Sequence, residues 1–128
     1  MRLAAPAVLA LCVAPPVAAC PLTAQDGARV AAGAVTLAWR AVPQPITVGT
    51  PFVMQLRLCP ADAQLVALDA TMPEHRHGMN YKPSLNALGQ GRWRAEGLLW
   101  HMSGRWQLRF EVQHGGAKQA LTQDVTLP

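Results

Sequence analysis

The sequence has few of the features that mark enzymes. Only seven of its 128 residues are Asp or Glu, and they stand singly, so no carboxylate pair suggests a general acid and base. The chain has no glycine-rich phosphate loop and no nucleophile elbow. Ser84 and Ser103 have no neighbours that would activate a hydroxyl. These absences favour a protein without catalytic activity.

Long hydrophobic runs are scarce as well, and the one present lies at the start of the chain. Arg2 is followed by an apolar run, Leu3–Val13, and then by the small-residue stretch Val17–Cys20. A charged start, a short apolar core and a small-residue exit make up a secretory signal. The run is shorter than the roughly 20 apolar residues that span a bilayer. The pattern predicts a signal peptide over residues 1–19 and a periplasmic or secreted mature protein.

Cysteine is rare, with three residues in the chain. Cys12 is expected to leave with the signal peptide, so Cys20 and Cys59 remain. The stretch ending at Cys20 resembles a lipobox, which predicts lipidation of Cys20 and a membrane-anchored lipoprotein. An oxidising compartment instead favours a Cys20–Cys59 disulfide, because leftover thiols are unusual in exported proteins. The two modifications exclude each other, and the sequence favours the disulfide by a small margin.

Basic residues exceed acidic ones, for a net charge of +4. The basic residues are scattered along the chain, which is not the footprint of a nucleic-acid-binding protein. The mature chain has the length of one small domain. We expect an N-terminal extension over residues 20–33 and a single domain over residues 34–128.

Alternation of apolar and polar residues is the recurring pattern of the mature chain. In Trp106–Val112 every second residue is apolar and the others are polar or charged, as in a strand with one buried face. Residues 27–32 are expected to form a short helical turn. About seven short antiparallel strands separated by Pro and Gly turns predict an all-β sandwich. The other candidate strands are Val35–Arg40, Phe52–Leu58, Leu65–Met72, Arg92–Ala95 and Ala120–Leu127.

Histidine and methionine gather in two segments that interrupt this alternation. The first runs from Met72 to Met79 and includes His75 and His77, and the second is the pair His101-Met102. Loops at the same end of a sandwich lie near one another, so we expect the two segments to meet. The plainer interpretation is that methionine fills the core, as expected for Met54, and that loop histidines are solvated.

The mixture of ligand types predicts copper. Thioether sulfur is soft and selects Cu(I), while imidazole accepts copper in both oxidation states. In an extended His75-x-His77 segment both side chains leave the same face. The second shell, which orients the imidazoles, is predicted to include Glu74 or Tyr81. The candidate metal ligands are His75, His77, Met79, His101, Met102 and Met72.

The segments Asp69–Met79, Gly91–Trp93 and Gly97–Trp106 resemble the YtkA-like and FixH-like group of small exported bacterial domains. The resemblance implies an immunoglobulin-like sandwich and a connection with copper handling and cytochrome oxidase maturation. It places the family's His/Met loop on the candidate ligands named above. The chain departs from the FixH type, which keeps an uncleaved membrane helix, and lacks the Met-rich tails of dedicated copper carriers.

Two functional hypotheses follow. In the first, the protein binds copper and exchanges it with a copper-donating or copper-accepting envelope protein. In the second, it is a metal-free interaction domain whose loop around Pro73–His77 contacts a protein or a small ligand. Neither hypothesis involves nucleic acid, and contact with a membrane is expected only if Cys20 is lipidated.

Overall fold

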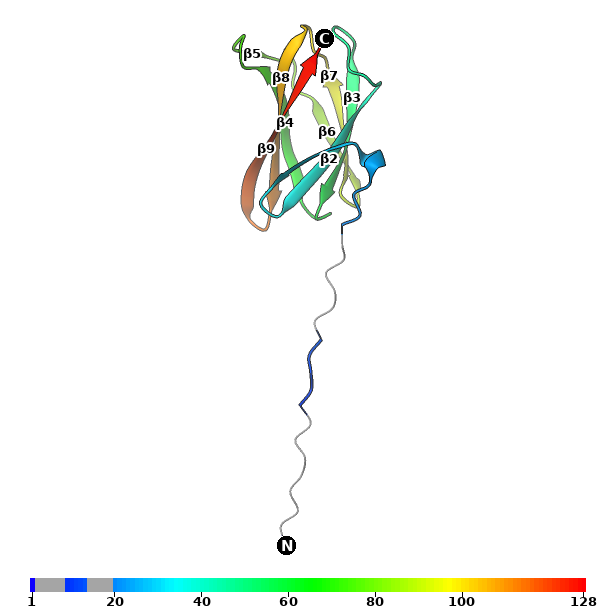
Figure 1. Ribbon diagram of the computed structural model, residues 1–128, viewed down its shortest axis with the longest axis vertical. Helices are drawn as coiled ribbons and strands as arrows, with labels where there is room; N and C mark the ends of the chain where they lie inside the picture. The colour runs from blue at the N-terminus through cyan, green and yellow to red at the C-terminus, as the bar shows by residue number, and fades with distance from the viewer. Residues whose placement is uncertain (2–8, 14–19) are drawn as a thin grey trace.

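The structure is a computed structural model that describes residues 1, 9–13 and 20–128. Most of the predicted signal peptide, residues 2–8 and 14–19, lies outside the described residues. The folded part consists of two antiparallel sheets packed face to face, so the predicted all-β sandwich is confirmed (Figure 1). Within the part of the chain that is described, no helix has the length and apolar character needed to cross a bilayer.

One sheet has five strands and the other has four. A 3-10 helix, η1 (Ala24–Asp26), precedes the first strand. The five-stranded sheet has the order β1 (Ala28–Ala32), β2 (Val35–Val42), β3 (Phe52–Cys59), β7 (Arg92–Leu98) and β6 (Ser84–Gly89). The four-stranded sheet has the order β5 (His77–Gly78), β4 (Gln64–Met72), β8 (Gly104–His114) and β9 (Ala117–Leu127).

The strand order is that of an immunoglobulin-like domain. Strands β2-β3-β7-β6 correspond to the A-B-E-D sheet of a constant-type domain, and β4-β8-β9 correspond to its C-F-G sheet. Strand β1 is added at the edge beside β2, and β5 is added at the edge beside β4. The loop after β4 and the loop between β7 and β8 therefore emerge at the same end of the sandwich.

The predicted helical turn over residues 27–32 is wrong. Residues 28–32 form strand β1, which pairs with β2 through partners such as Val30 and Leu37. The alanine-rich segment has no strong strand propensity of its own, but the free edge of β2 offers it a row of backbone hydrogen-bond partners. The segment expected to be an extension therefore contributes a strand to the sandwich.

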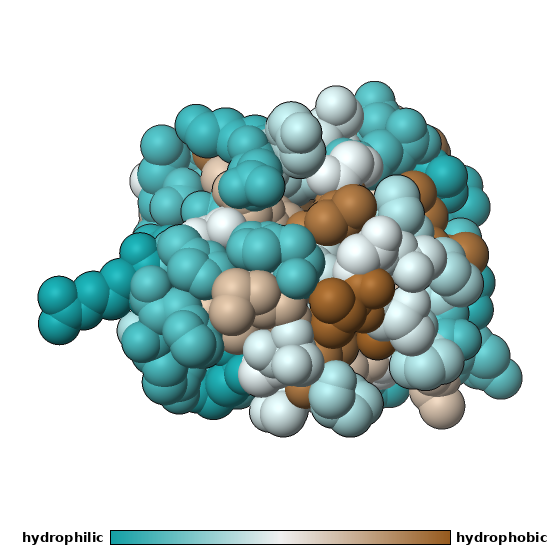
Figure 2. Space-filling view, turned by 90° about the horizontal axis from the view of Figure 1, so that it is seen from above, coloured by the Kyte–Doolittle hydropathy of each residue, from teal (hydrophilic) through white to brown (hydrophobic). Residues whose placement is uncertain are grey.

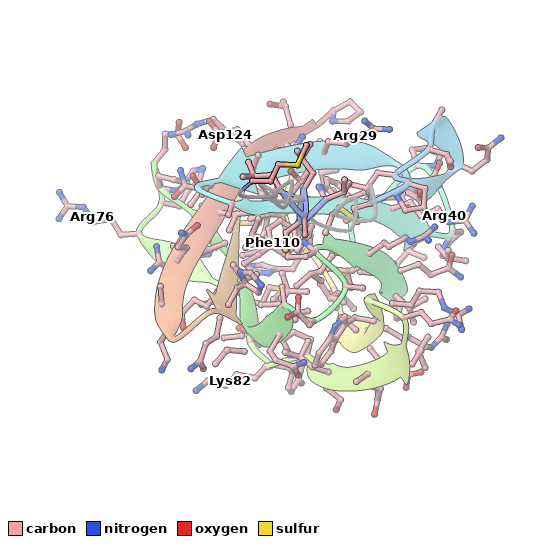
Figure 3. All side chains as sticks on the ribbon, turned by 90° about the horizontal axis from the view of Figure 1, so that it is seen from below. Arg29, Arg40, Arg76, Lys82, Phe110 and Asp124 are labelled. Carbon is pink, nitrogen blue, oxygen red and sulfur yellow. A yellow bond between two sulfur atoms is a disulfide. The ribbon has the colours of Figure 1, made fainter. Side chains whose placement is uncertain are left out.

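The core lies between the two sheets, and its three largest fully buried side chains, Trp100, Trp106 and Phe110, are aromatic. Trp100 and Trp106 are completely buried and stack with ring centroids 5.1 Å apart and an interplanar angle of 6°. Phe110 lies between the sheets, while Arg40 and Arg76 extend outward (Figure 3). The predicted packing roles of Trp106 and Met54 are confirmed, since both side chains are 0% exposed.

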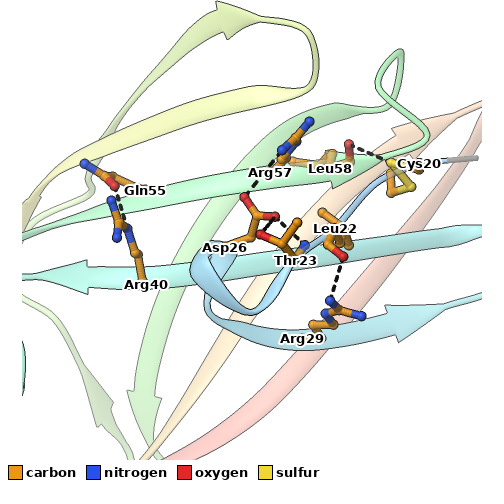
Figure 4. Close-up of polar contacts among 10 residues, drawn as sticks. Cys20, Leu22, Thr23, Asp26, Arg29, Arg40, Gln55, Arg57 and Leu58 are labelled. Atoms are coloured by element: carbon orange, nitrogen blue, oxygen red, sulfur yellow. Dashed lines mark hydrogen bonds and ion pairs between the residues drawn. A yellow bond between two sulfur atoms is a disulfide. The ribbon is translucent and has the colours of Figure 1, made fainter.

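Cys20 and Cys59 form a disulfide with Cα atoms 5.5 Å apart. It joins the segment before η1 to the last residue of β3, and the predicted cysteine pair is thereby confirmed (Figure 4). The bond occupies the sulfur that a lipid on Cys20 would require. It also holds η1 against the outer face of the five-stranded sheet.

Candidate metal centre

The two His/Met segments meet at one end of the sandwich. The His77 ring lies between two others, with centroids 5.7 Å from His75 and 5.1 Å from His101. These three residues come from the turn after β4, from β5 and from the loop between β7 and β8. The expectation that loops at the same end come together is confirmed.

The first segment reaches this position through a tight turn. The amide of His75 donates to the carbonyl of Met72 over 3.1 Å, and Arg76 takes a left-handed backbone with φ of 53°. The chain then folds back so that His77 pairs with Met72. Glycine suits position 78, because a Cβ atom there would lie only 3.1 Å from the carbonyl oxygen of Ala70. The turn thus returns His77 onto the edge of the four-stranded sheet.

Two hydrogen bonds to backbone carbonyls hold the second segment in place. The carbonyl of Trp100 accepts a hydrogen bond from the amide of Gly49 over 2.8 Å. The carbonyl of Met102 accepts one from the indole N–H of Trp106 over 3.0 Å. Because Trp100 and Trp106 are both buried, His101 is presented at the surface from a loop fixed to the core.

His77 has an unusual environment for a polar side chain. Its Nδ1 atom is buried and has no hydrogen-bond partner among the described residues. Its ring is inclined at 70° to that of Trp106 with the centroids 6.3 Å apart, and the His101 ring centroid lies 5.7 Å from that of the same indole. Buried polar atoms are nearly always paired, so an unpaired one calls for a bound water, an ion or a functional role.

The methionines of the two segments differ in burial. Met72 is 0% exposed and belongs to the core. Met79 and Met102 are half-buried and pack against the core from its edge. Copper exchange with a partner would require ligands that can be reached from solvent. Of the three methionines, only Met79 and Met102 meet that requirement.

A cluster of acidic and basic side chains secures the turn. The Arg105 guanidinium donates to Glu74 over 2.7 Å and to Asp124 over 3.0 Å, and its hydrogen bond lowers the pKa of Glu74. Tyr81 is 71% exposed. In the described part of the chain, neither Glu74 nor Tyr81 hydrogen-bonds to an imidazole, so the arrangement does not provide the predicted second shell.

The described residues contain no group of three or more His, Cys, Asp or Glu side chains arranged to hold a metal ion. Methionine is not one of those residue types, so a centre at this end depends on imidazole and thioether together. His114 is far from this end, because β8 is 11 residues long and places roughly 30 Å between its two ends. Its Nε2 atom lies 3.2 Å from the carboxylate of Asp62.

The fold and these residues define a β-sandwich that carries a His/Met surface at one end. Comparisons with protein-family models, curated proteins and solved structures found no match. The resemblance to the YtkA-like and FixH-like group therefore remains a prediction from the motifs.

Proposed function

We propose that this protein is an exported copper-binding protein that takes up a copper ion at the His/Met end and passes it to a partner in the envelope. The observation that carries the proposal is the buried, unpaired Nδ1 atom of His77 with the His101 ring 5.1 Å away. His77 and His101 supply nitrogen, and Met79 and Met102 supply sulfur. His75 is an additional imidazole that reaches His77 from the solvent side.

The separation of the rings fits a shared ion. Two imidazoles bound to one ion at about 2.0–2.1 Å, in a tetrahedral arrangement, have ring centres roughly 5 Å apart. The His77 and His101 rings are already near this separation. Thioether ligands favour Cu(I) over zinc, and imidazole accepts Cu(I) as well, so the mixture of side chains at this end suits that ion.

The accessibility of the site favours transfer over catalysis. His75 and His101 are exposed, so an incoming protein can reach the ion and displace its ligands one at a time. Figure 2 views the molecule from this end and shows hydrophobic side chains in the middle of the face with hydrophilic ones around them. Such a surface suits a transient contact with another protein.

The proposed location follows from the N-terminal sequence and from the disulfide. Residues 1–19 have the pattern of a cleaved signal peptide. Disulfides persist in oxidising compartments, and the periplasm is one of them. We place the mature protein in the periplasm or outside the cell.

A second candidate function is a metal-free interaction domain. It is favoured by the finding that no three His, Cys, Asp or Glu side chains in the described residues are arranged to hold a metal ion. In this alternative the exposed turn, residues 73–76, contacts a protein or a small ligand, and the three imidazoles form part of that surface.

The test is a competition titration of Cu(I) between the mature protein and a chromophoric chelator. We expect one equivalent to bind, and His77→Ala to weaken it at least about a hundredfold, since even groups that only orient a ligand contribute 10–100-fold. The matched control is His114→Ala, which removes a histidine from the other end of β8 and should leave the affinity unchanged. Wild-type binding no tighter than that of His77→Ala would contradict the proposed copper centre, and binding by neither protein would favour the metal-free alternative.

A further inference from the structure

A second feature with the character of a binding site lies on the outer face of the five-stranded sheet. Here a groove of about 330 Å³ is bordered by η1, β2, β3, β6 and β7. Ten basic residues lie in the described part of the chain. Four of these ten line the groove: Arg40, Arg57, Arg92 and Arg94. Basic residues that are scattered in the sequence are therefore gathered in space.

The register of the strands explains why the four arginines lie close together. Gln55 of β3 pairs with Arg40 on one side and Arg94 on the other, so these two arginines flank one position. Two residues further along β3, Arg57 pairs directly with Arg92. Residues two apart on a strand share a face and lie about 7 Å apart. The four guanidinium groups thus project from two adjacent rows of the same sheet face.

Carboxylates neutralise only half of this charge. Arg57 lies 3.6 Å from Asp26, and Arg94 pairs with Glu96. Arg40 donates to the neutral amide oxygen of Gln55 over 2.7 Å (Figure 4). Among the described residues, neither Arg40 nor Arg92 forms an ion pair. Four arginines and two carboxylates leave two positive charges at the groove.

The wall formed by η1 is held rigidly. The backbone N–H of Thr23 donates to the Asp26 carboxylate over 2.7 Å, and the Cys20–Cys59 disulfide anchors the preceding segment to β3 (Figure 4). The Asp26 carboxylate is thereby kept beside Arg57 and away from Arg40. The arrangement leaves the guanidinium groups of Arg40 and Arg92 available to a ligand.

Like charges that face each other across a strand pair are destabilising, as with Arg57 and Arg92. A bound anion relieves that repulsion, and a planar guanidinium matches a carboxylate or phosphate through two parallel hydrogen bonds. The groove is at the small end of the roughly 300–1,000 Å³ range of small-molecule sites. Leu88, which is 52% exposed, adds apolar surface to it.

We infer that this groove binds a small anion that carries two phosphate or carboxylate groups, with Arg40 and Arg92 as its principal contacts. This site is independent of the proposed copper centre, because it lies on the face of the other sheet and shares no residue with the His/Met end.

The experiment is an NMR titration of the mature protein with pyrophosphate and, separately, with succinate, at an ionic strength held constant with sodium chloride. We expect at least one of them to give saturable shifts confined to η1, β2, β3, β6 and β7. Arg40→Gln/Arg92→Gln should weaken binding by roughly tenfold or more, as expected for lost charge-assisted hydrogen bonds.

The matched control is Arg109→Gln, which removes an exposed arginine from β8 in the other sheet and should leave the affinity unchanged. Circular dichroism establishes that both variants are folded. The inference is overturned if neither anion saturates the shifts, or if Arg109→Gln weakens binding as much as the groove variant does.

Discussion

Trp106→Ala is expected to destabilise the protein by about 3–5 kcal/mol, the usual cost of removing a large aromatic side chain from a core. Trp106 is completely buried and stacks on Trp100, so its loss leaves a cavity between the sheets. Its indole N–H also donates to the Met102 carbonyl, which would lose that partner. Urea unfolding followed by circular dichroism measures the change in the free energy of unfolding.

The comparison variant is Trp93→Ala. Trp93 is half-buried on β7 and packs against the core from its edge, so its removal should cost clearly less. Because Trp106 supports the loop that carries His101, Trp106→Ala should also weaken copper binding, whereas Trp93→Ala should not. Equal destabilisation by the two variants would show that Trp106 is not the central element of the core.

Removing the disulfide is the second change with a large expected effect. The bond joins residues 39 positions apart. Closing a loop of that length restricts the unfolded chain by about 4 kcal/mol in the chain-entropy treatment, and typical measured values are about 2–4 kcal/mol. Cys20→Ser/Cys59→Ser should therefore lower the free energy of unfolding by about 2–4 kcal/mol in urea titrations.

Two controls make this result interpretable. Each single serine variant should lose about as much stability as the double variant, because either one abolishes the bond. The intact mass of the mature protein should fall by two hydrogens relative to the reduced chain. A diacylglyceryl mass on Cys20, or a double variant as stable as wild type, would contradict the disulfide.

Alternation of apolar and polar residues was sufficient to predict most of the sandwich. It identified the segments of β3 and β8, where one face is buried along the whole strand. It missed β6, whose residues are mostly exposed and show no alternation, and β5, which has two residues. It also missed β1, because an edge strand formed through pairing with a neighbour leaves little signal in its own sequence.

The candidate metal centre was predictable in its residues but not in its details. Once a sandwich was expected, the meeting of His77 with His101 followed from loops that share one end. The partner of Glu74 is Arg105, which lies 31 positions away, and no local pattern indicates such a pairing. The burial that separates Met72 from Met79 likewise depends on how β4 packs against the other sheet.

The arginine groove also could not be predicted from local sequence patterns. Its four arginines belong to three strands, and they converge because β7 pairs with β3 although many residues separate them in the chain. Charge counted along the sequence shows only scattered basic residues. The pairing of β7 with β3 is not specified by local sequence patterns, and it is this pairing that brings the arginines together on one surface.

The most direct test of the central claim is X-ray absorption spectroscopy of the mature protein loaded with one equivalent of Cu(I). We expect nitrogen and sulfur together in the first coordination shell. The sulfur contribution should decrease in Met79→Leu, and the nitrogen contribution should decrease in His77→Ala. A shell of nitrogen and oxygen alone that is unchanged in both variants would contradict a copper centre built from the two His/Met segments.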